Sequence, residues 1–406
     1  MRLAIVTQRI LTTSVLSTML IGVTVEGAPA APVRPQVLIE TSLAATPVTG
    51  KTIRVAAGGD FQAALNSAEP GDEIVLEAGA TYTGNFVLPA KNANGKWITV
   101  RTSDLAGLPK ESVRVGPEHA RAMPKIVGPN SGGAICTALH ASYWRLIGLE
   151  VTVSPTVKNV WALVRLGSGK AEQNTLAVVA HHLILDRPSI HGDPAQNCFR
   201  CVALNSAHSA VIDSHLAEGH AQGFDAQAIG GWNGPGPFKI VNNYLAGSGE
   251  NEMFGGADPA IPDLVPSDIE FRGNYCFKPL SWKIGHPSYA GLAGAVKNLF
   301  ELKNARRVLI EGNLFENSWT HAQNGTARKI MPELVKAGVR ASPHLWMWTP
   351  RPYYAAHLAA GVGNIDILEG IPGKAAGIDY SAYAIKDGRL QVPQSPGFGL
   401  RLAPSD

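Results

Sequence analysis

The chain has 406 residues, 45% hydrophobic and 17% charged, a composition typical of a globular protein with an apolar core and room for one large domain or a few ordinary ones. Its formal net charge of +3 is close to neutral, and no block of Lys or Arg stands out. Clustered basic residues are the electrostatic footprint of nucleic-acid binding, so we expect no nucleic-acid partner.

The N-terminus has the layout of a secretory signal. Arg2 and Arg9 make a positive start, the apolar run ILTTSVLSTMLIGVTV follows, and EGAPAAP supplies small residues for cleavage. The run is about 16 residues long and contains Thr and Ser, so it is short for a membrane span. We predict a signal peptide over 1–30, a linker over 31–51 and a secreted or periplasmic protein, with an uncleaved anchor as the alternative.

From residue 52 onward the pattern is one of strands, interrupted early by one short helix. The stretch DFQAALNSA predicts that helix, with Asp60 as its cap and Phe61, Ala64 and Leu65 on one face. The strand IRV precedes it, and EIVLEAG follows after a PGD turn. Until about residue 330 no long amphipathic helix appears, and short apolar strands recur between Gly, Asn and Pro.

These strands share a repeated phrase. HHLILDRPSIHG, HSAVIDSHLAEG, FKIVNNYLAGSG, DIEFRGNYCFKP and RRVLIEGNLFEN each place a polar or glycine corner between two short apolar strands. The interval is about 30 residues, which is typical of a solenoid whose coils must stack because one coil is too short to bury its own apolar face. We take as equivalent corners Arg187, Ser214, Asn243, Asn274 and Asn313.

Asparagine suits such a corner for two reasons. It tolerates left-handed backbone angles, and in a stacked coil its side chain can hydrogen-bond to the same position in the next coil. We predict a ladder of Asn243, Asn274 and Asn313, with ordinary surface turns as the alternative.

The motif CFRC at Cys198 and Cys201 has the spacing of metal ligands, and His191 and His208 flank it. A structural zinc ion needs four ligands, and the chain has no second cysteine pair. Four cysteines in a chain of this length do not make a disulfide scaffold, so we expect buried small apolar side chains or one incidental disulfide.

The stretch DFQAALNSAEPGDEIVLEAGATYTG resembles the N-terminal turn and capping helix of right-handed parallel β-helix proteins of the pectin-lyase-like superfamily. GENEMFGGADP and VKNLFELKNARRVLIEGNLFE resemble an exported bacterial β-helix family. The resemblance covers about 50–325 and implies a parallel β-helix domain over 52–325, truncated at its C-terminal end. It leaves the function open, because this fold hosts lyases, hydrolases, esterases and binding proteins.

After Gly325 the pattern changes to helix–strand–helix–strand, which indicates a small α/β unit. ASPHLW, YYAAHLAAGVGN, ILEG and DGRLQVPQSPGFGLRL resemble the C-terminal end of enolase-superfamily enzymes of the mandelate-racemase type, which include sugar-acid dehydratases and racemases. The resemblance implies a partial barrel over 326–406, in which His344 and Glu369 occupy the places of a histidine acid/base and a carboxylate.

Only about two of the eight barrel strands are present, and the strands that supply metal ligands are missing, so we expect this fragment to be inactive alone. We interpret the chain as a chimeric reading frame, produced by an old gene fusion or by an error in assembling the DNA.

Enzymes built on a parallel β-helix usually act on polysaccharides along one strand face, and two mechanisms fit the residues present. Lyases use Lys or Arg to remove a proton beside a uronate, often with calcium, whereas hydrolases use paired carboxylates. The segment FKPLSWK offers Lys283 as a base beside Trp282, and Arg272 is a second cation. Asp225 and Gln227 lie two residues apart, so their side chains leave an extended strand on the same face.

The glycine-rich segment GSGENEMFGGADP contributes oxygen ligands that could hold calcium, although it lacks the spacing of an EF-hand. The predicted metal ligands are Glu250, Glu252 and Asp258. The predicted catalytic residues are Lys283, Arg272, Glu250 and Asp225, and the predicted substrate-binding residues are Gln227, Trp232, Trp282 and Asn251.

Two interpretations follow. The first is an exported enzyme acting on an acidic glycan, a polysaccharide lyase before a hydrolase. The second is a non-catalytic carbohydrate-binding or surface β-helix. An enzyme of the first kind needs Lys283, Arg272 and the 250–252 loop on one face, and scattered positions favour the second. In both cases we expect a monomer.

Overall fold

The computed structural model describes residues 33–319, 321–322, 338, 340, 344–349, 351–362, 365, 369–372, 377–387, 389–395 and 397–402. The predicted signal peptide and the predicted helical segment IMPELVKAG lie almost entirely outside the described residues. No described helix is long and apolar enough to cross a membrane.

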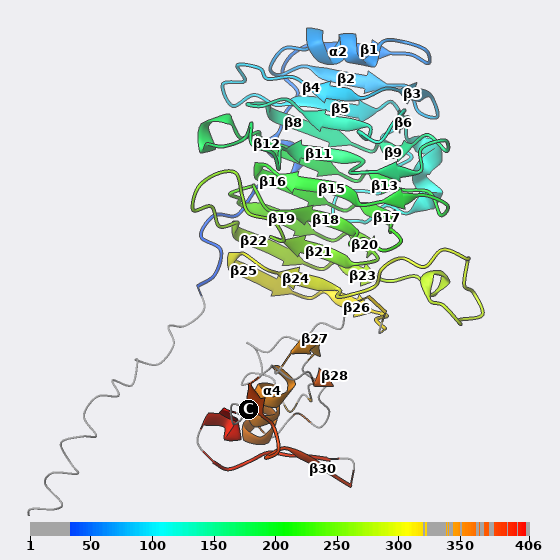
Figure 1. The fold of residues 1–406 in the computed structure, drawn as a ribbon. Helices are drawn as coiled ribbons and strands as arrows, with labels where there is room; N and C mark the ends of the chain where they lie inside the picture. Colours follow the sequence, from blue (N-terminus) through cyan, green and yellow to red (C-terminus); the bar gives the residue numbers. More distant parts are fainter. Residues whose placement is uncertain are drawn as a thin grey trace, which may run out of the picture. The chain divides into compact units, whose positions relative to one another are not determined.

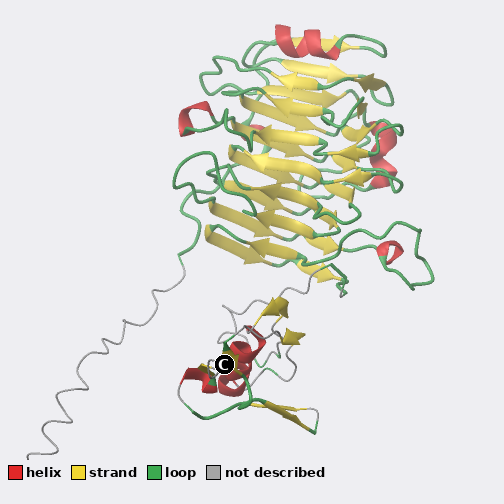
Figure 2. Cartoon of the chain, in the orientation of Figure 1, coloured by secondary structure: helices red, strands yellow, loops and turns green. Residues whose placement is uncertain are grey.

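Residues 52–316 form a parallel β-helix, as the repeated phrase predicted (Figure 1). Each complete coil contributes one strand to each of three sheets in a fixed order, the incomplete first and last coils contribute fewer, and every strand pair of these sheets is parallel. Short helices lie only at one end and in the loops between strands (Figure 2). Each strand therefore buries one face against the other two sheets and satisfies its backbone groups with the coils on either side.

The first sheet, called sheet A, has nine strands. They are β1 (Thr52–Val55), β2 (Glu73–Leu76), β5 (Ile98–Thr102), β8 (Ser142–Ile147), β12 (His181–Asp186), β16 (Ala207–Ile212), β19 (Phe238–Val241), β22 (Ser267–Arg272) and β25 (Arg306–Glu311).

Sheet B has eight strands. They are β3 (Thr81–Thr83), β6 (Lys125–Gly128), β9 (Glu150–Val153), β13 (Ser189–His191), β17 (His215–Gly219), β20 (Tyr244–Gly247), β23 (Tyr275–Phe277) and β26 (Leu314–Glu316).

Sheet C has seven strands. They are β4 (Phe86–Leu88), β7 (Ile135–Thr137), β11 (Val164–Gly167), β15 (Arg200–Asn205), β18 (Gln227–Gly231), β21 (Glu250–Phe254) and β24 (Phe300–Leu302). A separate parallel pair joins β10 (Asn159–Val160) to β14 (Asn197–Cys198). The 3-10 helices are η1 (Leu43–Ala45), η2 (Pro117–Ala122), η3 (Leu176–Val178) and η4 (Leu280–Trp282).

The predicted N-terminal helix is confirmed as α2 (Phe61–Ser67). The side chain of Asp60 accepts a hydrogen bond from the backbone N–H of Ala63 at 2.9 Å, which satisfies a donor that the first helical turn leaves free. Phe61, Ala64 and Leu65 are buried, so the helix covers the apolar end of the first coil.

The predicted asparagine ladder is also present. The side-chain oxygen of Asn274 accepts hydrogen bonds at 3.0 Å from both the backbone N–H and the side-chain amide of Asn243, and Asn313 does the same for Asn274. The left-handed residue, however, is the one before the asparagine, such as Asn242 at φ 57°. Arg187 itself has φ 52°, so it is equivalent to Asp213, and our alignment of Arg187 with Ser214 was wrong by one residue.

All four cysteines are free; three of them are buried, and Cys136 is partly buried. Cys198, Cys201 and Cys276 belong to the apolar core that runs along the interior of the β-helix. The prediction that they act as small apolar side chains is therefore confirmed for these three.

An extended segment, residues 35–46, lies across the outer face of sheet A and is called the strap. The backbone N–H of Gln36 donates to Asp268 on β22 at 2.9 Å, and Lys239 on β19 donates to the carbonyl of Ile39. Further along, the buried guanidinium of Arg145 on β8 donates to the carbonyl of Ser42. The strap thus crosses several coils and covers much of this face.

The described residues beyond 343 form short elements of mixed helix and strand. They include β27 (His344–Thr349), α4 (Arg351–Val362) and β28 (Glu369–Pro372), and the two strands pair in parallel with His344 opposite Glu369. This β–α–β order agrees with the predicted α/β fragment. The elements after β28 are β29 (Ile378–Asp379), β30 (Ala384–Lys386), β31 (Arg389–Gln391), η6 (Gly397–Gly399) and β32 (Arg401–Leu402).

Candidate functional site

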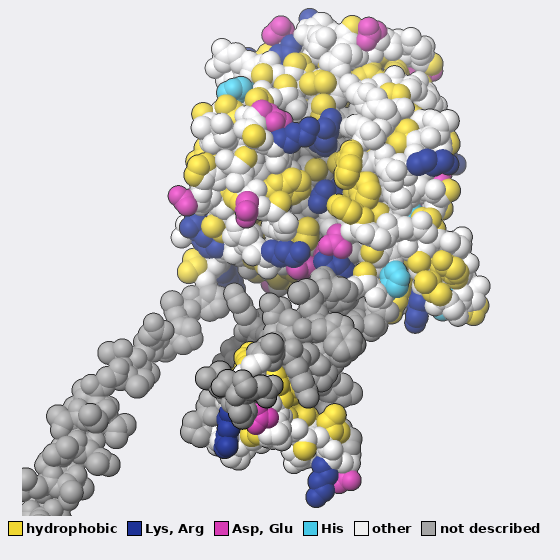
Figure 3. All heavy atoms as spheres, in the orientation of Figure 1, with side chains coloured by type: hydrophobic (Ala, Val, Ile, Leu, Met, Phe, Trp, Pro, Cys, Tyr) yellow, Lys and Arg dark blue, Asp and Glu magenta, His cyan; other side chains and the backbone are white. Residues whose placement is uncertain are grey.

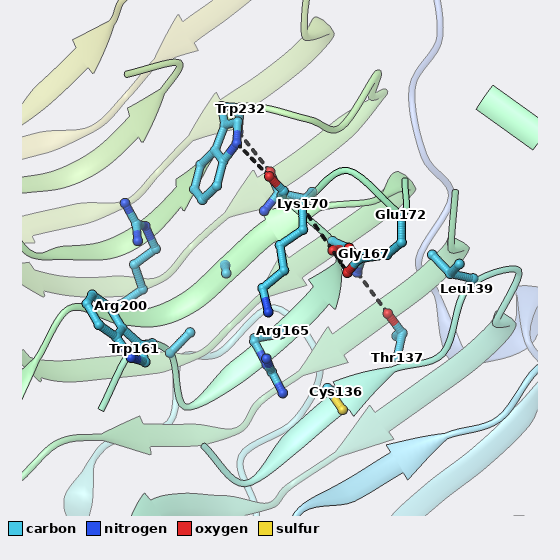
Figure 4. A pocket seen from close by; sticks show the side chains of 15 residues that line it. Cys136, Thr137, Leu139, Trp161, Arg165, Gly167, Lys170, Glu172, Arg200 and Trp232 are labelled. Carbon is cyan, nitrogen blue, oxygen red and sulfur yellow. Dashed lines mark hydrogen bonds between the residues drawn. The ribbon is translucent and has the colours of Figure 1, made fainter. Parts of the chain in front are cut away.

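The outer face of sheet C carries a groove of about 590 Å³ (Figure 4). In the space-filling view, basic and apolar side chains lie together over this sheet (Figure 3). Residues from β7, β11 and β15 form its floor, and the loop after β11 forms one wall. The residues that line it are Cys136, Thr137, Leu139, Trp161, Ala162, Arg165, Gly167, Ser168, Gly169, Lys170, Glu172, Arg200, Ala203, Asn205 and Trp232.

Arg165 is aimed into the groove by the alternation of its strand. Val164 and Leu166 on either side of it are core residues, so the side chain between them points outward. In the neighbouring strand its register partner is Ala203, and the partner of Ala203 is Gly230. Because Ala203 and Gly230 have small or no side chains, the groove stays open beside the guanidinium of Arg165.

Arg200 enters the same groove from the start of β15. Its guanidinium lies over the ring of Trp232, 5.0 Å from the ring centroid. The indole N–H of Trp232 donates to the carbonyl of Gly169 at 3.3 Å, which fixes the ring in the loop wall. Burial lowers the pKa of Arg200, but a guanidinium stays charged at any physiological pH.

Neither arginine forms a salt bridge within the described part of the chain. The Nε atoms of Arg165 and Arg200 are buried without a hydrogen-bond partner. Among the described residues, no carboxylate lies within 4.0 Å of either guanidinium. Glu172 attracts Arg165, and Glu250 and Asp225 attract Arg200, only from beyond salt-bridge distance, so each guanidinium keeps the capacity to pair directly with an anion.

Exposed aromatic rings lie beside these cations. Trp161 is 56% exposed and stacks on Phe199, with the ring centroids 4.7 Å apart. Phe224, 47% exposed, packs edge-on against Phe199 and also contacts Trp161 edge-on, with these two ring centroids 6.4 Å apart. Exposed rings supported from below are suited to stacking against the apolar face of a flat ligand.

The loop wall places Lys170 above the floor. Gln173 is fully buried and donates to the carbonyls of Asn205 and Asn233, which anchors the loop to β15 and to the segment after β18. Figure 4 shows the Lys170 side chain reaching from this loop toward Arg165.

Three of the predicted site residues come together next to the groove. Gln227 donates to Glu250 at 2.7 Å, and the amine of Lys297 contacts Glu250 at 2.7 Å and Asp225 at 2.8 Å. Burial opposes the charge on Lys297, but its bonds to Asp225 and Glu250 prevail and raise its pKa. Lys297 is therefore a protonated amine that ties two carboxylates together.

The other predicted catalytic residues lie apart from this cluster. Arg272 is on sheet A, where it pairs with Glu270 and Glu311. Lys283 is in the loop after β23, with its amine 5.9 Å from the ring centroid of Trp319. Sheet A and sheet C face different directions, so the single face that the lyase prediction required for Lys283, Arg272 and the 250–252 loop is not formed.

Two of the predicted binding residues are structural. Trp282 is buried in the loop after β23, against His220 with ring centroids 5.2 Å apart. Asn251 is buried, and its side-chain amide donates to the carbonyls of Leu245 and Phe277, which holds the bend between β20 and β21. Trp232, in contrast, is part of the groove.

The predicted calcium ligands do not converge. Glu250 points outward to Lys297, whereas Glu252 is fully buried, with neither oxygen hydrogen-bonded. Asp258 is exposed in the loop that follows β21. Within the described part of the chain, no group of three or more His, Cys, Asp or Glu side chains is arranged to hold a metal ion.

Four residues of the groove were not predicted from the sequence: Arg165, Arg200, Trp161 and Lys170. The available signal was a charged residue between two core apolar residues, as in VRL at 164–166, because such a residue must leave the strand on its outer face. The site residues predicted from the sequence all lie between Asp225 and Lys283 in the β-helix, C-terminal to this pattern.

No protein-family model and no curated protein sequence matches the chain. Among solved structures, it is similar to an alginate lyase from Paenibacillus sp. str. FPU-7, with 16% identity and a TM-score of 0.29 over 66% of this chain and 98% of that one. It is also similar to pectate lyase Pel9A, with 14% identity and a TM-score of 0.31 over 70% and 83% of the two chains. A third similar structure is the PL6 family alginate lyase AlyGC, with 15% identity and a TM-score of 0.28. The match covers 70% of this chain and 41% of that one. These likenesses say nothing about the residues of the groove.

Proposed function

We propose that this protein binds an anionic polysaccharide in the groove on sheet C. The observation that supports this proposal is the pair of guanidiniums, Arg165 and Arg200, which lack a direct carboxylate partner and lie between two tryptophans in an open groove. A guanidinium binds a uronate carboxylate or a sulfate through two parallel hydrogen bonds. Trp161 and Trp232 supply surfaces on which sugar rings can stack.

The proposal can be tested by affinity electrophoresis in gels containing pectate, alginate or chondroitin sulfate, with neutral dextran as the reference. We expect retardation only in the charged gels, and a loss of affinity of at least about tenfold for Arg165→Ala and for Arg200→Ala. Arg54→Ala is the matched control, because it removes the same charge from an exposed position on sheet A. Migration that is unchanged in all three charged gels would show the proposal to be wrong.

A lyase is the second candidate, and the position of Lys170 favours it. Elimination from a uronate needs a base that removes the C5 proton and a cation on the carboxylate, and the C4–O4 bond then breaks with water supplying a proton to the leaving oxygen. Lys170 reaches toward Arg165 in the same groove, so it could take the first role while the arginines take the second. Lys297 suits the role of base poorly, because its carboxylate partners keep it protonated.

Absorbance in the unsaturated-uronide band separates the two candidates. A lyase increases this absorbance on pectate, alginate or chondroitin, and Lys170→Ala abolishes the increase while binding remains. Binding without any increase in absorbance leaves the non-catalytic carbohydrate-binding protein as the function.

We also propose that the protein is exported and monomeric, and that the α/β fragment entered the reading frame from an enolase-superfamily gene. The support is the change of pattern at Gly325 and the β–α–β unit that follows. Amplification from source DNA across the codons for Gly325 and Thr326 tests the junction: a continuous product supports a gene fusion, and its absence indicates an assembly error.

A further inference from the structure

The loop that forms one wall of the groove, residues 168–173, is closed on itself and is called the wall loop. The backbone N–H of Ser168 donates to the side-chain oxygen of Gln173 at 2.9 Å. The backbone N–H of Gln173 in turn donates to the carbonyl of Lys170 at 3.1 Å. These bonds tie the two ends of the wall loop together, so its shape does not depend on a ligand.

A buried polar network fastens the wall loop to the next coils. The side-chain amide of Asn233 donates to the carbonyls of Ser168 and Gln173 at 3.0 Å and 2.9 Å. The side-chain oxygen of Asn205 accepts from the backbone N–H groups of Trp232 and Asn233, both at 2.9 Å. Because Asn205, Asn233 and Gln173 are buried, and buried polar networks with paired members are rigid, the wall loop and the backbone of Trp232 belong to one framework.

The ring of Trp232 lies directly against Gly169 of the wall loop, and its indole N–H donates to the Gly169 carbonyl at 3.3 Å. A methyl group built on Gly169 would lie 2.1 Å from Cζ2 and 2.9 Å from Cη2 of this ring, far inside van der Waals contact. Gly169 has no positive φ, so its backbone would tolerate another residue type. Glycine is needed at this position because the ring occupies the space of a side chain.

The same ring supports the guanidinium of Arg200, which lies 5.0 Å from the ring centroid. A cation is attracted to the face of an indole by the negative charge of that face. No described carboxylate is close enough to this guanidinium to form a salt bridge, and its Nε has no hydrogen-bond partner. The direction of the Arg200 side chain therefore depends on where the ring of Trp232 lies.

We propose that Gly169 is a positioning residue, which sets the direction of Arg200 through the ring of Trp232 and thereby the affinity of the groove for an anionic glycan. This inference rests on the proposed function and deepens it, because it identifies what prepares Arg200 for the ligand. A side chain that is held in place before binding loses less conformational entropy when it pairs with a carboxylate or a sulfate. A side chain at position 169 displaces the ring and releases Arg200.

A double-mutant cycle of Gly169→Ala and Trp232→Phe, measured as affinity for pectate, tests the proposal. We expect Gly169→Ala to weaken binding about fivefold, the size of one lost cation–π contact. A phenylalanine ring lacks the Cζ2 and Cη2 atoms, so in the Trp232→Phe protein the same methyl group has room and should change the affinity by less than about twofold. Equal losses in both backgrounds would show that the methyl group acts on the wall loop alone, and would overturn the proposal.

A second measurement needs no ligand. In protein labelled with a nitrogen isotope at tryptophan, the indole resonance that disappears in Trp232→Phe belongs to Trp232. Gly169→Ala should shift this resonance, because the indole N–H loses its bond to the Gly169 carbonyl, and should leave the resonance of the exposed Trp161 in place. A Trp232 resonance that does not move would contradict the positioning role.

The outcomes also separate the positioning role from the groove. If the wild-type protein binds pectate but the cycle shows equal losses, the positioning role is wrong while the proposed function stands. If the wild-type protein binds no charged glycan, the proposed function is wrong and the positioning role falls with it.

Discussion

Glu252 places a carboxyl group in the apolar core of the β-helix, and this burial predicts how the stability of the protein depends on pH. It lies on β21 between Ile229 and Phe300 in the register of sheet C, it is 0% exposed, and neither oxygen is hydrogen-bonded. Burial, with a smaller contribution from the charge of Glu250, raises its pKa well above the ordinary value of 4.5. The folded protein therefore holds this proton over a pH range in which the unfolded chain has released it.

The sign of the effect on stability follows from this difference. Above pH 4.5 the folded state binds one more proton than the unfolded state, so the free energy of unfolding falls as pH rises. The fall is about 1.4 kcal/mol per pH unit and stops at the folded-state pKa. Glu252→Gln removes this dependence, and Glu252→Leu also removes the unsatisfied polar atoms, which would stabilise the protein by about 1–3 kcal/mol at neutral pH.

The assay is urea unfolding at pH 5, 6, 7 and 8, followed by circular dichroism for the wild-type protein and both variants. Glu69→Gln, at an exposed position, serves as the control for loss of a carboxylate. We expect both core variants to have a flatter pH dependence than the wild type, and Glu252→Leu to have the highest midpoint at pH 8. A Glu252→Gln protein with the wild-type slope would refute the reasoning.

Two further predictions concern the corner ladder and the aromatic platform. Asn274→Ala deprives Asn243 of its acceptor and the carbonyl of Ile240 of its donor, so it should lower the free energy of unfolding by about 2–4 kcal/mol. Urea denaturation measures this loss, with Asn92→Ala at an exposed position as the control. An equal loss of stability in both variants would disprove the role of the ladder. Trp161→Ala should weaken glycan binding about tenfold with little change in Tm, because the ring is 56% exposed and its support, Phe199, stays in place. Titration by intrinsic fluorescence, with calorimetry for stability, tests the second prediction, which an unchanged affinity would contradict.

The fold was predictable because its determinants are local and repeated. Asp60 precedes an apolar helical face, and the asparagines recur at the same place in each phrase, so cap and ladder could be predicted from spacing. The position of the left-handed residue was not predictable by spacing alone, since Arg187, Asp213 and Asn242 share no side-chain type. The left-handed position is determined by where the backbone must turn, and several polar residue types tolerate left-handed backbone angles.

The site was less predictable, because it depends on the register between coils. Asp225 and Gln227 both lie near Glu250 and Lys297, although Asp225 precedes β18. Strict alternation would also put Glu250 and Glu252 on one face. Asn251 breaks the alternation by turning inward to the carbonyls of Leu245 and Phe277, so Glu252 enters the core. Arg165 and Arg200 lie in successive coils, and the register in which β11 pairs with β15 determines how close they come.

The strap changes how the β-helix can come apart. A stack of coils that touch only their neighbours can fray from an end, one coil at a time. Here the backbone N–H of Gln36 in the strap donates to Asp268, 232 positions further along the chain. The strap is therefore hydrogen-bonded to a coil near the C-terminal end of the β-helix. The final coils cannot unfold before the hydrogen bonds of the strap break. Removal of the strap by cutting the chain after residue 46 should therefore replace one cooperative unfolding transition with gradual fraying of the coils.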